Sequence, residues 1–165
     1  YILSDNGFGN KLGLNIEDLE FGKMQMSNKK LVDLEGKLGF DFSFSYPASI
    51  RNDTIERTIK SKLSKELHVE CIHNYDPVYF DKNGFLCKTL KATYEKVTGM
   101  DGTPVTTTGG TYAKIMPNIV PFGPSFPGQK GIGHNPNEWM DRSDLILNAK
   151  IYALSIVRLA NGEND

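Results

Sequence analysis

The chain has 165 residues, of which 39% are hydrophobic and 24% are charged, and its formal net charge is -1. This composition fits one or two small folded domains and excludes a disordered chain. The near-neutral charge argues against a nucleic-acid partner, and the lack of a long apolar run argues against a membrane partner. The two cysteines, Cys71 and Cys87, form no disulfide framework, so we expect a cytoplasmic location.

The chain starts at Tyr1 rather than at a methionine, and its first apolar residues lead directly into a glycine-rich break. This start is typical of the interior of a longer sequence. We therefore expect the chain to be a fragment, with a processed terminus or a trimmed tag as the alternative.

Residues 21–46 predict strands, with a turn at residues 27–30. After Gly39, residues 40–46 alternate between aromatic side chains and small or polar ones. This alternation is the pattern of a half-buried strand, and Pro47 ends it.

Residues 53–66 predict a helix, with Asp53 and Glu56 spaced to form a capping box at its start. Its buried stripe repeats every four residues, while its lysines face water. The stripe consists of Ile55, Ile59 and Leu63. Residues 67–72 then predict another strand.

Residues 85–98 predict a second helix, and Gly99 supplies its C-terminal stop. One face of this helix is expected to be apolar and buried, and it comprises Leu86, Leu90, Tyr94 and Val97. Residues 99–136 are rich in glycine and proline and predict irregular structure with short strands, chiefly at residues 118–122.

Residues 142–160 predict the last helix, which Asp141 and Asp144 can cap. Its expected buried face comprises Leu145, Ala149, Tyr152, Ala153, Ile156 and Ala160. The order of strands and helices predicts an α/β fold in two units, with a boundary near residues 74–81.

His134 is a candidate metal ligand, because it lies in a Gly- and Pro-rich turn just before the last helix. A catalytic zinc needs about three protein ligands and an open position. The nearby carboxylates are Glu138 and Asp141, and Glu138 can instead orient the loop. A surface histidine with no ligand role is the alternative.

Gly109, Gly110 and Thr111 form a second candidate site ahead of a short predicted helical turn. Backbone N–H groups in such a turn can bind a carboxylate or a phosphate. The pattern of a phosphate-binding P-loop is absent. An ordinary tight turn is the alternative.

The segment 68–73 contains two histidines and a cysteine, which suggests a zinc site. In a strand, however, Cys71 and His73 share one face while His68 points to the other. The spacing therefore favours a strand of mixed polarity over a metal site.

Residues 108–113 and 133–138, taken together at this separation, resemble the C-terminal part of the di-zinc aminoacylase and dipeptidase metallopeptidases, and in particular the bacterial dipeptidase V branch. The resemblance covers most of the chain. It implies that residues 1–77 are the latter part of an α+β lid domain. It also implies that residues 78–165 are the C-terminal part of an α/β zinc-peptidase catalytic domain.

By this resemblance, the complete protein is a cytoplasmic enzyme that uses two zinc ions to hydrolyse short peptides. His134 is the ligand that this chain contributes, and the turn at Gly109, Gly110 and Thr111 contacts the substrate carboxylate. The other ligands and the first half of the lid have no counterpart here. We therefore expect the chain to need the missing N-terminal portion of the same protein and to be inactive alone.

The sequence departs from the family at one position. The family usually has an arginine just before the Tyr46-Pro47 pair, where this chain has Ser45, and Arg51 is the nearest substitute. Serine carries no charge and cannot form an ion pair with a carboxylate. A non-catalytic binding or assembly module, a degraded paralogue, and an N-acyl amino acid deacylase therefore stay open as alternatives.

Overall fold

The computed structural model describes residues 6–107, 109–123, 125–129 and 133–163. Two compact units make up the chain. The first combines Tyr1–Tyr79 with Thr106–Pro117, and the second combines Phe80–Val105 with Asn118–Asp165. Helices and strands both occur, which confirms the α/β expectation. Within the described ranges, no helix is long and apolar enough to cross a membrane.

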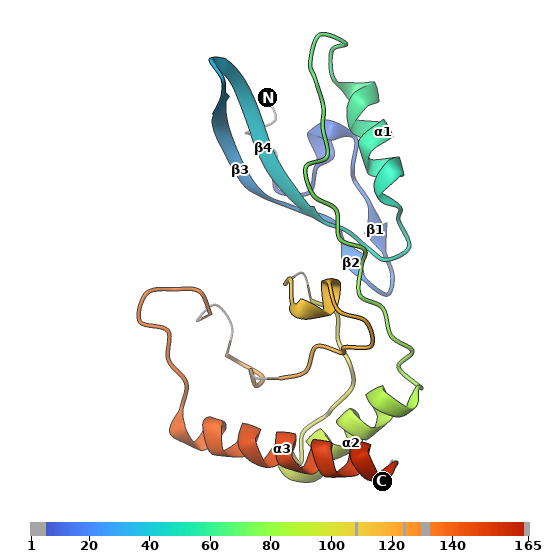
Figure 1. Ribbon diagram of the computed structural model, residues 1–165, viewed down its shortest axis with the longest axis vertical. Helices are drawn as coiled ribbons and strands as arrows, with labels where there is room; N and C mark the ends of the chain where they lie inside the picture. The colour runs from blue at the N-terminus through green and yellow to red at the C-terminus, as the bar shows by residue number, and fades with distance from the viewer. Residues whose placement is uncertain (1–5, 108, 124, 130–132, 164–165) are drawn as a thin grey trace. The chain divides into compact units, whose positions relative to one another are not determined.

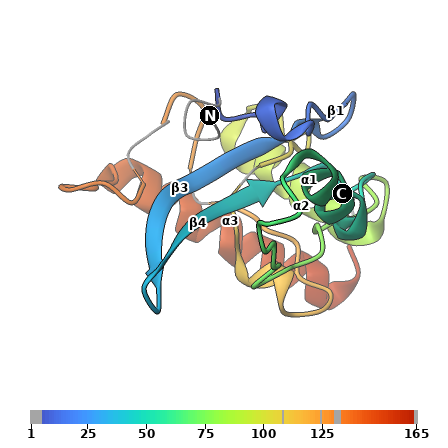
Figure 2. The same ribbon diagram turned by 90° about the horizontal axis from the view of Figure 1, so that it is seen from above.

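A long antiparallel hairpin, β3 (Gln25–Leu34) and β4 (Lys37–Ser45), is the main feature of the first unit (Figures 1 and 2). Glu35 and Gly36 form its two-residue turn, with φ of 54° and 81°. Positive φ at both central residues matches the twist of a hairpin, so glycine is favoured at the second.

The turn expected at residues 27–30 is wrong, because β3 runs straight through it. Ser27 pairs with Ser43, and the next pair is Lys30 with Asp41, so β3 carries one extra residue at this point. The extra residue is absorbed as a β-bulge rather than as a chain reversal. The ammonium of Lys30 lies 3.2 Å from the carboxylate of Asp41, which supports this register.

The core of the first unit lies where the hairpin meets helix α1 (Asn52–Lys62) and the 3-10 turn η2 (Asn10–Leu12). Two short strands, β1 (Glu17–Asp18) and β2 (Gly22–Lys23), pair beside it. The buried side chains of this core are Leu12, Leu14, Met24, Met26, Ile55 and Ile59.

The alternation expected along β4 is confirmed, since Phe42, Phe44 and Tyr46 all pack on this core. The far end of the hairpin extends away from α1 in both views (Figures 1 and 2). There Leu34 and Leu38 are exposed, because no described element covers them.

The helix expected at residues 53–66 is present but ends at Lys62, and its capping box is wrong. Asp53 lies inside the first turn, with Arg51 at the N-cap and no side-chain capping bond. The carboxylate of Asp53 instead contacts the guanidinium groups of Arg51 and Arg57, at 3.3 and 3.5 Å. The strand expected at residues 67–72 is also wrong, because no strand among the described residues pairs with this segment.

Helices α2 (Phe85–Thr98) and α3 (Arg142–Asn161) pack against each other in the second unit (Figure 1). Both expected helices are confirmed, and Gly99 ends α2 in the left-handed conformation with φ 70°. The strand expected at residues 118–122 is wrong, because nothing in the described part of the chain pairs with this segment.

The buried face predicted for α3 is also wrong. The side chains that face α2 are mostly polar, and they are Asn148, Ile151, Ser155 and Arg158. The apolar residues that periodicity assigned to the interior are exposed, with Leu145 at 60% and Ile156 at 68%. Asp141 occupies the N-cap of α3 but makes no side-chain capping bond.

Candidate functional site

His134 lies on the turn at residues 133–137, ahead of α3, and is exposed. Its φ of 62° is in the left-handed region, which few residues other than glycine adopt. The N–H of His134 donates to Oε2 of Glu138 at 3.1 Å, and the N–H of Glu138 donates to the carbonyl of Asn135 at 3.2 Å. These bonds give Glu138 the loop-orienting role that its spacing suggested.

The segment before this turn is tied to both helices of the second unit. The side-chain amide of Gln129 donates to the carboxylate of Asp144 in α3, and its oxygen accepts from the N–H of Phe126 at 3.0 Å. The ring of Phe126 stacks on Tyr94 of α2, with 6.3 Å between centroids. Sequence reasoning missed Gln129 because one polar residue in a Gly- and Pro-rich loop carries no periodic signal.

The residues around His134 do not make a complete metal site by themselves. No group of three or more His, Cys, Asp or Glu side chains that could hold a metal occurs among the residues described above. Glu138 already accepts the N–H of His134. A catalytic zinc needs about three protein ligands, so one imidazole does not suffice.

Gly109 and Thr111 lie on an exposed loop that leads into η3 (Tyr112–Lys114). The N–H of Gly109 donates to the hydroxyl of Thr107 at 3.2 Å, and the hydroxyl of Thr111 accepts from the N–H of Ala113 at 3.2 Å. The short helical turn that was expected is therefore present. Two of its backbone donors, however, are already bound within the turn.

Gly110 has a cationic neighbour in the same turn. The Nζ of Lys114 lies 3.9 Å from the position that a Cβ on Gly110 would occupy. A positive charge beside the turn favours an anion such as a carboxylate. The structure thus groups Gly109, Gly110 and Thr111 in one turn of the first unit and places His134 in the second.

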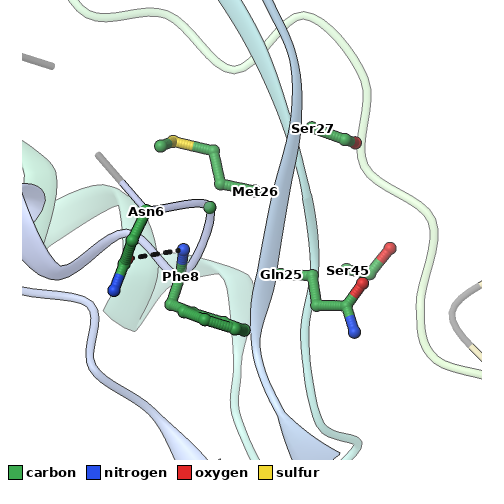
Figure 3. Close-up of a pocket in the computed structure, with 7 residues that line it drawn as sticks. Asn6, Phe8, Gln25, Met26, Ser27 and Ser45 are labelled. Carbon is green, nitrogen blue, oxygen red and sulfur yellow. Dashed lines mark hydrogen bonds between the residues drawn. The ribbon is translucent and has the colours of Figure 1, made fainter. Parts of the chain in front are cut away.

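Ser45, which the resemblance sets where the family usually has an arginine, lines a cavity of about 430 Å³ (Figure 3). Figure 3 shows its side chain on the same side of the hairpin as that of Gln25, its partner across the strands. The cavity is lined by Asn6, Gly7, Phe8, Gln25, Met26, Ser27 and Ser45. None of these described lining side chains is charged, so this part of the cavity wall offers no ion pair to a carboxylate.

Arg51, the nearest candidate to replace that arginine, lines a different cavity of about 570 Å³ in the same unit. Its guanidinium contacts Asp53 at 3.3 Å. In this second cavity the hydroxyl of Tyr46 donates to Oδ1 of Asn74 at 2.7 Å. Burial, with the nearby charge of Asp76, raises the pKa of Tyr46.

The segment 68–73 forms a loop of the first unit rather than a strand. Cys71 is exposed, and its sulfur lies 3.8 Å from the amide nitrogen of Asn52 and 3.5 Å from the carbonyl of His73. The imidazole of His68 lies 3.9 Å from the carboxylate of Glu70, and both are largely exposed. These contacts are local and do not bring several metal-ligating side chains together.

A profile of Peptidase family M20/M25/M40 matches residues 6–158 of the chain. The chain belongs to this family. The match includes both the Gly109–Gly110 turn and the His134 turn, and it spans both compact units.

Relatives within the family M20/M25/M40 carry dipeptidase names. The Beta-Ala-Xaa dipeptidase of Lactobacillus delbrueckii subsp. lactis is 32% identical over 158 residues, which are 94% of this chain and 33% of that protein. The "Putative dipeptidase YtjP" of Bacillus subtilis is 29% identical over 153 residues, 92% of this chain and 33% of that protein. The chain therefore spans about a third of the length of these relatives.

Proposed function

We propose that this chain is part of a metal-dependent dipeptidase, and that the complete protein hydrolyses short peptides. The observation that carries the proposal is the family match over residues 6–158, together with relatives named as dipeptidases. One relative is named for β-Ala-Xaa dipeptides, which makes a dipeptide with a free carboxylate the first substrate to test. The two free cysteines among the described residues fit our expectation of a cytoplasmic enzyme.

In this proposal His134 contributes one metal ligand, and the other ligands come from the part of the protein outside this chain. Its exposed side chain, on a turn braced by Glu138, supports that role. A braced backbone restricts the directions that an imidazole can take, as a ligand requires. We expect two zinc ions in the complete protein, as the family resemblance implies.

Gly109, Gly110 and Thr111 contact the substrate carboxylate in this proposal, with the ammonium of Lys114 beside them. The exposure of the loop and the 3.9 Å spacing of Lys114 from Gly110 support a site for an anion. The internal bonds of the turn at Gly109 and Ala113 hold its shape. We expect these residues to affect substrate affinity more than turnover.

The second candidate function is a non-catalytic binding or assembly role, as in a degraded paralogue. The lining of the cavity around Ser45 favours it, because its described side chains include no charged group that could pair with a carboxylate. Deacylation of N-acyl amino acids is a narrower alternative that keeps the metal-dependent chemistry.

The experiment that tests these functions uses the full-length gene product, loaded with zinc, and a panel of dipeptides and N-acyl amino acids. We expect dipeptide hydrolysis. We also expect His134→Ala to lower kcat/KM by roughly a hundredfold or more, since loss of an outer-shell partner alone costs about 10–100-fold. His68→Ala is the matched control, because His68 is an exposed histidine of the first unit.

The outcomes separate the candidates. Turnover confined to N-acyl amino acids would favour the deacylase. No turnover by a folded, zinc-loaded product would favour the non-catalytic role. Equal activity and metal content in His134→Ala and the wild type would show that His134 is not a metal ligand.

A further inference from the structure

The sequence contains three Asn-Gly pairs, at residues 6–7, 83–84 and 161–162. In such a pair the glycine nitrogen can attack the side-chain amide of the asparagine, because glycine has no Cβ to hinder the approach. The second pair precedes α2 and the third ends α3, whereas the first lies in an irregular segment beside β3. The same chemistry is therefore placed in three different surroundings.

The two pairs at helix ends are held against this attack. The N–H of Gly84 donates to the carbonyl of Asp81 at 3.0 Å, and the N–H of Gly162 donates to the carbonyl of Leu159 at 3.4 Å. Each bond must break before the glycine nitrogen can lose its proton and act as a nucleophile. Asn161 is also the last residue of α3, so its backbone is fixed in the helical conformation.

The side-chain oxygen of Asn6, in the first pair, accepts two hydrogen bonds. The N–H of Phe8 donates to Oδ1 of Asn6 at 3.3 Å, as Figure 3 shows, and Nδ2 of Asn10 donates to the same oxygen at 3.2 Å. An attack on Cγ of Asn6 moves negative charge onto this oxygen. Donors that are already in place stabilise the developing charge and so lower the barrier.

The backbone around these donors is fixed by bonds to the rest of the first unit. The carbonyl of Gly9 accepts from the N–H groups of Leu12 and Leu14, both at 3.0 Å. The carbonyl of Gly7 accepts from the N–H of Met26 in β3 at 2.7 Å. Gly7 has a φ of 91°, which few residues other than glycine adopt. The donors to Asn6 are therefore held in position before any reaction.

We propose that Asn6 is a site of spontaneous deamidation, promoted by the turn at residues 6–10. The nitrogen of Gly7 loses its proton and bonds to Cγ of Asn6. The bond between Cγ and Nδ2 then breaks, and the nitrogen leaves as ammonia with that proton. Water opens the resulting cyclic imide and gives aspartate or isoaspartate, so water is the one reactant that is added.

The product changes the charge of the cavity shown in Figure 3. Asn6 lines this cavity together with Gln25 and Ser45, and the described lining side chains are uncharged, so the new carboxylate is a charge that they lacked. Isoaspartate also adds a methylene to the main chain directly ahead of Gly7, whose carbonyl binds Met26. The inference does not rest on the proposed function, because the conversion is followed by mass and not by turnover.

The test incubates the full-length gene product in heavy-oxygen water at mildly alkaline pH, with and without urea. Each converted asparagine gains one heavy oxygen, and trypsin places the three pairs in different peptides because lysines and arginines lie between them. In the folded protein we expect Asn6 to convert at least about threefold faster than Asn83 and Asn161, because its oxyanion is stabilised. In urea we expect similar rates at all three, and Asn6 no faster than in the folded protein.

Asn10→Ala removes one of the two donors, and Asn15→Ala changes an exposed asparagine of the same segment as the matched control. We expect Asn10→Ala to slow the conversion of Asn6 at least about twofold, and Asn15→Ala to leave it unchanged. A wild-type rate in a folded Asn10→Ala variant would overturn the proposal. So would an Asn6 that converts no faster than Asn83 and Asn161 in the folded wild type, or faster in urea, and neither measurement needs a variant.

Discussion

Glu138 holds the backbone of His134 through a single hydrogen bond of 3.1 Å, at a residue with left-handed φ. Glu138→Ala removes the acceptor, so we expect the His134 amide to lose protection from hydrogen exchange. In the full-length enzyme we expect kcat/KM to fall about tenfold, the lower end of the range for partners of a metal ligand.

Glu138→Gln is the matched control, because its amide oxygen can still accept the same bond. We expect it to keep near-normal exchange at His134 and near-normal activity. If Glu138→Ala exchanges at His134 at the wild-type rate, the bracing role is wrong.

Asp18 is a carboxylate whose pKa the fold lowers. Hydrogen bonds from the hydroxyl of Ser49 at 2.7 Å and from the N–H groups of Phe21 and Glu20 lower its pKa below 3.8. A lowered pKa in the folded state stabilises the fold above the unfolded pKa, and this contribution is lost as the pH falls through the folded pKa.

Ser49→Ala removes the largest cause of that shift. We expect the pKa of Asp18, followed by NMR titration, to rise toward its ordinary value. We also expect the variant to lose less stability than the wild type as the pH falls below about 4. An unchanged Asp18 titration would show that the two backbone N–H groups alone hold the carboxylate.

The core between the hairpin and α1 gives an element-scale prediction. Leu12 is fully buried there, whereas Leu19 is fully exposed beside β1. We expect Leu12→Ala to lower the free energy of unfolding by about 2–5 kcal/mol, because it leaves a cavity in packed surroundings. Leu19→Ala should change it by less than about 0.5 kcal/mol. Urea titration followed by circular dichroism measures both, and similar losses would contradict this description of the core.

Local sequence information was sufficient for the helices and for β4. Each helix has its own period of apolar residues, and α2 has Gly99 as a stop. The predictions of strands at residues 67–72 and 118–122 were wrong because a strand needs a partner strand, and strand pairing is not a local property of the sequence. The prediction of a turn at residues 27–30 was wrong because β-bulges and turns contain similar polar residues.

The candidate site was predictable only in part. A histidine in a stiff turn and a pair of glycines are visible as motifs, and the spacing of Glu138 allowed either a ligand or a loop-orienting role. The bonds from Gln129 to Asp144, and the ion pairs that replace the capping box at Asp53, depend on contacts that no periodicity encodes. The face of α3 was misassigned because periodicity finds an apolar side and cannot tell what covers it.

In the proposed function the chain supplies one metal-binding imidazole, that of His134, where a catalytic zinc needs about three protein ligands. We therefore expect the purified 165-residue chain to bind zinc weakly, without a stoichiometric step in isothermal titration calorimetry, and to hydrolyse no dipeptide. A folded chain that binds one or two zinc ions tightly and turns over dipeptides would contradict both the division of the site and the proposed function.

The exposed apolar side chains of α3 also have a thermal consequence for the isolated chain. Complete domains increase their heat capacity on unfolding by about 12–15 cal/mol/K per residue, because apolar groups become hydrated. On α3, side chains such as Ile156 and Leu145 are already hydrated in the folded chain. Scanning calorimetry of the 165 residues should therefore give a smaller increase per residue, and a flatter dependence of stability on temperature.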